Sequence, residues 1–430
     1  MKSGLNLRGY DLGELLTTRR GWSLIAVAVL HQARPVLFLA ARWYRRHVVR
    51  STRLVAVVGS LGKSTTTRMV TAALGGDPSG ATERNGGVFL AWRVFQIRRG
   101  DPYSVIEVGI SRPGQMRTYA NFLCPDVAVV MMIGSEHNRS LGSLEATREQ
   151  KSEMVRALPA SGLAVLNGDD PHVRRMVRAT GARVVTFGLK PGRDVFASDI
   201  ALDWPEGTSF TIHLDGARRQ ARTRLIGRHM IYSVLAAAAV AAGEKVSLDE
   251  ILERLERVGP APGRMQPVRL MNGAVLLCDE SKSTMETVEA ALGTLGEIQA
   301  CRRIAVIGEI TDARGSAYPH YKRLGRLCAE ICAKVIFVGW SRKFRAISTG
   351  ARQSGLPLPS YSYAGRDVLS ALELLRADLR DGDVVLIKGR MSQKMERIAL
   401  GLLGRQVRCR RPECKYKMIR CSRCPALGAP

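Results

Sequence analysis

The stretch LVAVVGSLGKSTTTRMVTAAL, from Leu54 to Leu74, decides the fold of this chain. Leu54 to Val58 is a run of apolar and β-branched residues, which predicts a buried strand. Residues 59–62 break the run, and a helix with apolar periodicity follows from Lys63. A strand, a glycine turn and a helix N-terminus together form an anion site, because free backbone N–H groups and the positive helix end point to one place.

This loop predicts a site for nucleotide phosphates. Lys63 would reach the β- and γ-phosphates, and the hydroxyl of Ser64 would lie on Mg²⁺. The other loop residues expected at the phosphates are Gly59, Gly62 and Thr65. The loop has the shorter G-x-x-G-K-S form, since Val57 stands where the longer pattern has a glycine. The alternative, an ordinary turn with a solvated lysine, leaves the flanking strand and helix unexplained.

The composition favours anionic partners. The 430 residues exceed one ordinary core, so two or three domains are expected. A net charge of +27 suits nucleotides, phosphorylated intermediates or anionic lipid, although an arginine-biased proteome would give the same excess. The arginines are spread along the chain without an aromatic-interleaved module, so nucleic acid is not the expected partner; a P-loop NTPase acting on nucleic acid stays the weakest alternative.

From residue 51 strand-like runs alternate with helical stretches, which predicts an α/β fold. The fold class expected is a central P-loop domain with a mainly parallel sheet plus a C-terminal Rossmann-like α/β domain. The expected strands are 103–108, 127–133, 163–167, 183–187, 274–278, 303–307, 335–338 and 384–387, with an antiparallel flap at 195–226. The expected parts are an apolar and basic segment 1–50, a central ATP-binding domain 51–259, a ligase-like domain 260–405 and a basic, cysteine-rich tail 406–430.

The first part contains two apolar runs, 24–30 and 36–41, that His31 to Pro35 separate. A spanning helix needs about 20 mostly apolar residues, so this segment is not expected to cross a bilayer. Residues 20–48 are predicted to form an amphipathic helix or hairpin on a membrane surface, or a helix packed on the next domain. Five cysteines in apolar stretches read as reduced, which predicts a cytoplasmic protein, with the inner face of the membrane as its alternative place.

Seven segments in order resemble the Mur ligase family, and most closely its MurF branch, the UDP-N-acetylmuramoyl-tripeptide–D-alanyl-D-alanine ligases. They lie between about residues 54 and 398: VVGSLGKSTTT, IEVGISRPGQM, PDVAVVMMIGSEHNRSLGSLE, QKSEMVRALPASGLAVLNGDDP, GRHMIYSVLAAAAVA, GRMQPVRL and VVLIKGRMSQKMERI. The resemblance implies an ATP-dependent acid–amino-acid ligase, EC 6.3.2.-, acting in peptidoglycan-like biosynthesis. In such a ligase, a carboxylate attacks the γ-phosphate of ATP and becomes an acyl phosphate, and an amine then attacks the acyl carbon. Negative charge develops in both steps, so the site needs cations and fixed hydrogen-bond donors.

The resemblance also implies residue roles. Lys63 would hold the phosphates, and Ser64 with Glu107 would ligate a first Mg²⁺. His137 matches a histidine that binds a second Mg²⁺, and Lys151 matches a lysine that family members carry as a carbamate, an anion able to ligate Mg²⁺. The remaining matches are Asn85 on the substrate side; His229, Arg264 and Asp279 at the nucleotide; and Lys282 and Lys388 at the substrate.

Some positions depart from the family pattern. Met230 and Ser233 stand where asparagines are usual, and Arg390 follows Lys388-Gly389. These departures motivate an alternative, a non-catalytic ATP-binding scaffold or regulatory homologue. The segment before the P-loop is shorter than the family's uridine-nucleotide domain. Either the carboxylate substrate is not a UDP-sugar, or it is nucleotide- or lipid-linked and held differently; a poly-γ-glutamate-type synthase is a further alternative. The second substrate would be an amino acid or peptide amine.

The tail carries two cysteine pairs, Cys409 with Cys414 and Cys421 with Cys424. Four thiols so close in sequence could form a tetrahedral Zn²⁺ site. Free surface thiols or a tail that docks a partner explain the same pattern, because the pairs are closer together than in zinc ribbons.

Overall fold

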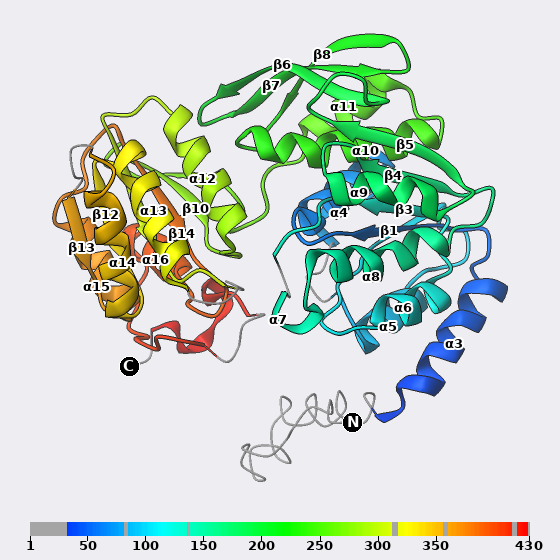
Figure 1. Cartoon of the computed structure of the whole chain (residues 1–430), viewed down its shortest axis with the longest axis horizontal. Helices are drawn as coiled ribbons and strands as arrows, with labels where there is room; N and C mark the ends of the chain where they lie inside the picture. Colours follow the sequence, from blue (N-terminus) through cyan, green and yellow to red (C-terminus); the bar gives the residue numbers. More distant parts are fainter. Residues whose placement is uncertain are drawn as a thin grey trace.

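The computed structural model describes residues 32–80, 85–135, 138–311, 317–355, 360–414 and 419–428. Two sheets, each covered by helices on both faces, lie side by side (Figure 1). The predicted fold class is confirmed. The predicted His137 and the run 24–30 lie outside the described residues.

The first sheet is built around the predicted P-loop strand. Its strands are β1 (Arg53–Val58), β2 (Tyr103–Glu107), β3 (Val127–Val130), β4 (Leu163–Asn167), β5 (Arg183–Gly188), β6 (Val195–Asp203), β7 (Gly207–Leu214) and β8 (Ala217–Thr223). They follow the order β2-β1-β3-β4-β5-β6-β7-β8, parallel as far as β6 and antiparallel from β6 to β8. The antiparallel part is the predicted flap.

Helices cover both faces of this sheet. The longer ones are α3 (Arg34–His47), α4 (Lys63–Ala73), α5 (Val88–Phe95), α6 (Gln115–Leu123), α8 (Leu144–Arg156), α10 (Ile231–Gly243) and α11 (Leu248–Glu256). The short ones are η1 (Pro78–Gly80), α7 (Asn138–Leu141), α9 (Pro171–Arg174), η2 (Arg175–Ala179) and η3 (Arg228–Met230). Alternate residues of β1 enter opposite cores: Val55 and Val57 pack with α4 and α10, and Leu54, Ala56 and Val58 pack with α5 and α6.

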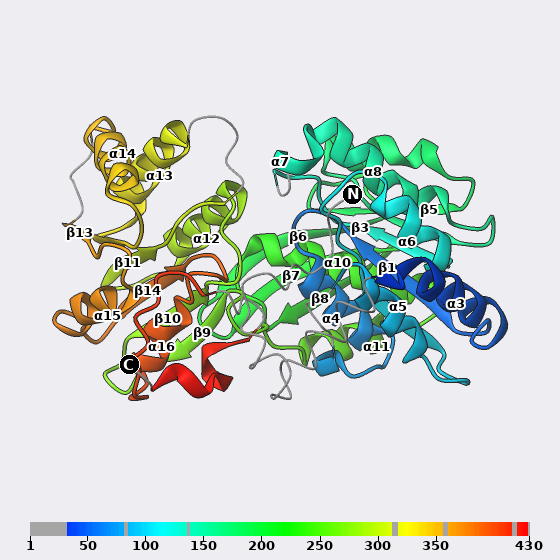
Figure 2. The same ribbon diagram turned by 90° about the horizontal axis from the view of Figure 1, so that it is seen from below.

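The second sheet has the order β13-β12-β11-β14-β10-β9, and only β9 is antiparallel to its neighbour. Its strands are β9 (Gln266–Arg269), β10 (Val275–Asp279), β11 (Arg302–Ile307), β12 (Lys334–Phe337), β13 (Ser360–Tyr363) and β14 (Asp383–Lys388). Its helices are α12 (Met285–Glu297), α13 (Tyr318–Ile331), α14 (Ser341–Arg352), α15 (Val368–Arg376) and α16 (Glu396–Leu402), with η4 (Cys421–Arg423) and η5 (Pro425–Leu427) in the tail. Each sheet and its helices form one body, the first around β1 and the second around β10, and Figure 2 shows both bodies from below.

One predicted strand is too long. The expectation for 127–133 fails after Val130, because the following residues leave the sheet to support the P-loop. The N–H of Ser60 donates to the carbonyl of Met132 at 2.6 Å, and the N–H of Ile133 donates to Asp170 at 2.8 Å. The apolar residues 131–133 therefore do not continue the strand; they form a loop that contacts the P-loop.

The N-terminal helix α3 packs one side on the first body through Leu37, Phe38 and Tyr44. Within the described ranges, no helix has both the length and the apolar character that crossing a bilayer requires. The predicted packing on the next domain is thus present for α3.

Candidate active site between the two sheets

Two glycines shape the P-loop. Gly62 has φ 82° and caps the N-terminus of α4, a left-handed conformation that glycine adopts without strain. Gly59 has φ 144°, and a Cβ built there would lie 3.0 Å from Cβ of Met131. Gly59 therefore lies against Met131, just after β3, where a side chain would crowd the backbone, and the loop leaves the N–H groups that begin α4 facing one cavity.

Three lysines converge on Ser60 of this loop. Lys63 Nζ donates to its carbonyl at 3.2 Å and to the Gly59 carbonyl at 2.9 Å. Lys282 Nζ, from the second body, donates to the same Ser60 carbonyl at 3.0 Å. Lys151 Nζ, from α8, lies 3.3 Å from the Ser60 hydroxyl. These three ammonium groups come from separate parts of the chain and together create a positive potential at the loop. An anionic ligand such as a triphosphate would bind there and neutralise it.

Oxygen donors lie beside this positive centre. Glu107 ends β2, is 7% exposed and accepts a hydrogen bond from Asn85 Nδ2 at 2.6 Å. Ser64 Oγ accepts from Arg264 Nη2 at 3.1 Å. These groups line a cavity of about 200 Å³ together with Ser60, Gly62, Lys63, Ser281, Lys282 and Met391. A hydroxyl and a carboxylate are the hard oxygen donors that Mg²⁺ prefers, so the residues present fit that ion.

Asn85 reaches Glu107 because Gly109 has no side chain. A Cβ on Gly109 would lie 2.7 Å from Oδ1 of Asn85, and the N–H of Gly109 donates to the Asn85 carbonyl at 2.7 Å. The predicted substrate-side Asn85 is therefore joined to Glu107, the predicted metal ligand.

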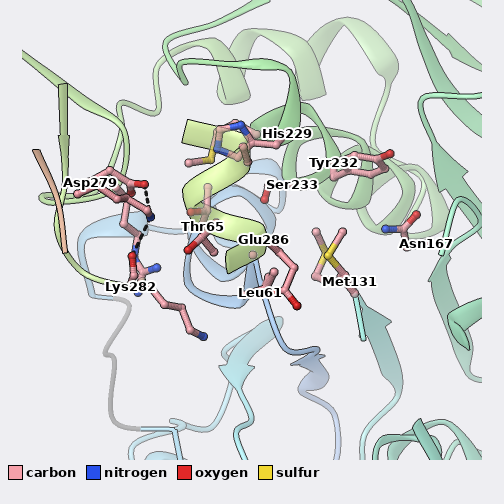
Figure 3. Close-up of a pocket in the computed structure, with 17 residues that line it drawn as sticks. Leu61, Thr65, Met131, Asn167, His229, Tyr232, Ser233, Asp279, Lys282 and Glu286 are labelled. Atoms are coloured by element: carbon pink, nitrogen blue, oxygen red, sulfur yellow. Dashed lines mark hydrogen bonds and ion pairs between the residues drawn. The ribbon is translucent and has the colours of Figure 1, made fainter. Parts of the chain in front are cut away.

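A second cavity of about 170 Å³ adjoins the P-loop (Figure 3). In that view Asp279 and Lys282 lie on one side, and Met131, Tyr232 and Asn167 lie on the other. His229, Thr65 and Arg264 also line it. Largely apolar walls next to a phosphate loop suit a flat, partly apolar group such as a nucleobase.

Two of the departures from the family pattern, Met230 and Ser233, line this second cavity. The Thr66 hydroxyl on α4 donates to Ser233 Oγ at 2.9 Å, and this hydrogen bond links α10 to the P-loop helix. Met230 adds an apolar wall. Neither residue supplies the side-chain amide that the resemblance leads one to expect, although Asn167 places one in the same cavity.

Asp279 and Lys388 are paired neighbours at the ends of β10 and β14. The Lys388 ammonium is 2.6 Å from Asp279 Oδ2 and donates to the Lys282 carbonyl at 2.7 Å. Burial lowers the pKa of Lys388, and the Asp279 charge opposes that shift. Lys388, the predicted substrate-binding lysine, thus uses these two hydrogen bonds to hold the loop that carries Lys282.

The tail docks on the second body through its backbone. Arg397, which is 1% exposed, donates to the carbonyls of Cys409 and Arg411, and Lys394 donates to that of Ile419. Among the described residues, no three His, Cys, Asp or Glu side chains lie together as metal ligands require. The zinc site expected from Cys409, Cys414, Cys421 and Cys424 is therefore not supported; the tail is anchored by cations bound to its carbonyl groups instead.

One tail residue also contacts the linker between the two sheets, and no sequence pattern marks it. Arg420 lies 2.9 Å from Glu280 and 2.7 Å from Glu396, both buried, and donates to the carbonyl of Pro262 at 3.0 Å. Glu280 directly follows Asp279, so the tail supports both the linker and the strand end that carries the site.

We expect Arg420→Ala to lower the free energy of unfolding by about 2 kcal/mol, because two buried carboxylates lose a partner whose side chain is only 36% exposed. Urea unfolding at neutral pH measures this loss, and the exposed Arg423→Ala serves as a matched control. Equal stability of the two variants would contradict the assigned contact.

The same variant should change the pH dependence of stability. Burial raises the pKa of Glu280 to about 6 from its ordinary 4.5, and Arg420 opposes that shift. A carboxyl whose folded-state pKa is raised binds its proton more tightly when folded, so the free energy of unfolding falls as pH rises from about 4.5 to about 6. Without Arg420 this fall should extend above pH 6, whereas Arg423→Ala should leave the profile unchanged.

Comparisons with known proteins agree with this arrangement. Residues 57–241 match the Mur ligase middle domain, and residues 263–391 match the Mur ligase, glutamate ligase domain. A UDP-N-acetylmuramoyl-tripeptide–D-alanyl-D-alanine ligase of Mycobacterium tuberculosis is 30% identical over 375 residues, which cover 82% of this chain and 73% of that protein.

Two solved structures share the fold. MurF from Acinetobacter baumannii gives a TM-score of 0.75 at 24% identity, covering 86% of this chain and 81% of that one. MurF ligase from Thermotoga maritima in complex with ADP gives a TM-score of 0.75 at 19% identity, covering 90% of this chain and 92% of that one.

Proposed function

Because the chain belongs to the Mur ligase family, we propose that it joins the amine of D-alanyl-D-alanine to the terminal carboxylate of a UDP-linked muramoyl tripeptide. The chain is a MurF-like, ATP-dependent ligase that forms a peptide bond. The substrates in the proposal are those that the names of its relatives state. In this proposal residues 51–259 bind the triphosphate, and residues 260–405 bind the amine.

The convergence of Lys63 and Lys282 on the Ser60 carbonyl carries this proposal. Attack of a carboxylate on the γ-phosphate spreads negative charge over the phosphoryl oxygens and the leaving ADP. Lys63 would neutralise charge at the transferred phosphoryl group, and Lys282 would add charge from the second body. Because Lys282 reaches the P-loop only when the bodies are together, the charge needed for transfer depends on their closure.

Ser64 and Glu107 would hold Mg²⁺, which supplies charge neutralisation at the phosphates when it is bound. Asn85 fixes the orientation of the Glu107 carboxylate. Lys151 as a carbamate and His137 as a ligand of a second ion remain part of the proposal. His229, Thr65, Arg264 and Asp279 would line the nucleotide, which matches their place around the second cavity.

Coupled ADP formation tests the proposal. Purified protein with ATP and Mg²⁺ should form ADP only when a UDP-linked tripeptide and D-alanyl-D-alanine are both present, and mass spectrometry should detect the pentapeptide product. Omission of either substrate and the variant Glu107→Gln are the controls. Glu107→Gln should lower the rate by about 100-fold or more, because an ion ligand loses its charge.

A screen of amino acids and dipeptides separates the alternatives. ADP formation with glutamate, and not with D-alanyl-D-alanine, would replace the proposal by a poly-γ-glutamate-type synthase. Absence of amine-dependent ADP formation with every amine, with and without UDP-linked acceptors, would leave an ATP-binding scaffold. The scaffold hypothesis is worth testing because three positions depart from the family pattern, namely Met230, Ser233 and Arg390.

A further inference from the structure

The outward side of α3 is apolar where a surface helix is usually polar. Val36, Leu39 and Trp43 are 71%, 68% and 60% exposed, and their spacing of three and four residues places them on one side of the helix. The opposite side already packs on the first body through Leu37 and Phe38. The exposed stripe is therefore additional to the packing that holds the helix.

Basic residues continue this stripe toward the C-terminal end of α3. Arg42, Arg46 and Arg50 line a hollow of about 410 Å³ between the helix end and the segment around Asp126. The Asp126 carboxylate forms an ion pair with Arg45 at 2.6 Å and accepts a hydrogen bond from the N–H of Leu54 at 2.7 Å. Arg45 lines the hollow too, but Arg42, Arg46 and Arg50 have no carboxylate within ion-pair distance in the described part of the chain.

The sequence around the helix carries the same charge. Residues 15–50 contain seven arginines and no Asp or Glu. Both views place α3 at the end of the molecule farthest from the second sheet (Figures 1 and 2). A flat surface could therefore approach this end without meeting the second body.

We propose that α3 docks the protein on an anionic membrane surface, with the Val36–Leu39–Trp43 stripe in the interfacial layer and lipid phosphates at Arg42, Arg46 and Arg50. An exposed tryptophan between apolar side chains and arginines suits the headgroup boundary, where apolar burial and attraction to phosphate act together. Three arginines without carboxylate partners favour anionic lipid over a purely apolar partner. The inference is independent of which substrates are joined.

Vesicle co-sedimentation of the full chain tests the proposal. Binding should be strong to phosphatidylcholine mixed with phosphatidylglycerol, weak to phosphatidylcholine alone, and weaker at high salt. The triple variant Arg42→Gln, Arg46→Gln, Arg50→Gln should bind anionic vesicles about 100-fold more weakly, since each basic residue near the surface contributes about one kcal/mol. The variant Val36→Ser, Leu39→Ser, Trp43→Ser should lose at least about ten-fold.

A matched charge control uses three exposed arginines of β8, as Arg218→Gln, Arg219→Gln, Arg222→Gln. This variant should keep its vesicle binding, and all three variants should keep the wild-type melting temperature and ADP formation in solution. Equal losses in the β8 and α3 arginine variants would reduce the effect to net charge and overturn the proposal.

Two other results would also overturn the proposal. If the wild type fails to bind vesicles but sediments as an oligomer that the apolar α3 variant dissociates, the stripe is an interface between copies. If vesicle binding is absent and the apolar variant instead melts at a lower temperature, the stripe is covered by the chain itself.

Discussion

Replacing Lys63 by alanine should lower ADP formation by about 1,000-fold, the scale expected when a cation is removed from a transferring phosphoryl group. Lys63 is 7% exposed, and its ammonium lies against the carbonyls of Gly59 and Ser60. In that position it lies within the loop that would surround the phosphates. The neighbouring Lys151 and Lys282 approach Ser60 from other elements, so neither would occupy its place.

The comparison of Lys63→Met with Lys63→Ala separates charge from volume. Methionine keeps most of the aliphatic stem, so equal inactivity of the two variants would assign the effect to the ammonium group. Lys190→Ala, at an exposed lysine, is the matched control and should keep full activity. ADP formation is measured at saturating ATP, and binding of ADP is measured separately by calorimetry.

The loss should appear mainly in kcat and much less in ADP affinity, because the charge is needed most where the γ-phosphoryl group leaves. Undiminished ADP formation in Lys63→Ala would contradict the assigned phosphate site. A loss of ADP affinity as large as the loss of rate would instead mean that Lys63 only binds the nucleotide.

The P-loop could be predicted from the sequence because its signal is local. A buried strand, two glycines and a helix start lie within one short stretch, and β1 and α4 form as expected. The contacts that complete the site are of another kind. Lys282 meets Ser60 across 222 positions, and Arg264 meets Ser64 across 200. No periodicity reports such pairs, and only the family resemblance pointed to these residues.

The cysteine tail shows why spacing alone misled. Two cysteine pairs suggest a metal, but the tail's backbone carbonyls are bound by Arg397 and Lys394, and these contacts set its path. The tail residue that pairs with two buried carboxylates is Arg420, an arginine among many in an arginine-rich chain. Its importance follows from burial of Glu280 and Glu396, which a single sequence does not reveal.

The α3 segment shows a different limit. The sequence left open whether this segment packs on the next domain or faces a membrane. One helix can do both, because its opposite sides carry different residues. Phe38 stacks on Phe122 at a centroid distance of 4.6 Å, whereas Trp43 stays 60% exposed. Hydropathy along the chain averages over these two sides and therefore cannot separate them.

Asp279→Asn should destabilise the protein by about 3–5 kcal/mol, because it leaves the Lys388 charge buried without its carboxylate. Lys388 is 1% exposed, and its ammonium lies 2.6 Å from Asp279. The double variant Asp279→Leu, Lys388→Met removes both charges and should recover most of the loss, since a buried pair replaced by apolar groups costs little. Glu206→Gln, which breaks the exposed pair with Arg269, is the control and should cost less than about 1 kcal/mol.

The pH dependence of this variant gives an independent check. Burial already lowers the pKa of Lys388 below 10.5, and loss of Asp279, which opposes that shift, lowers it further. The unfolded chain then binds the lysine proton more tightly than the folded one, so the free energy of unfolding should rise with pH up to about 10.5. Urea unfolding from neutral pH to about pH 10 should therefore show the deficit of Asp279→Asn shrinking. A deficit that is independent of pH would mean that lost packing, and not an uncompensated charge, accounts for the destabilisation.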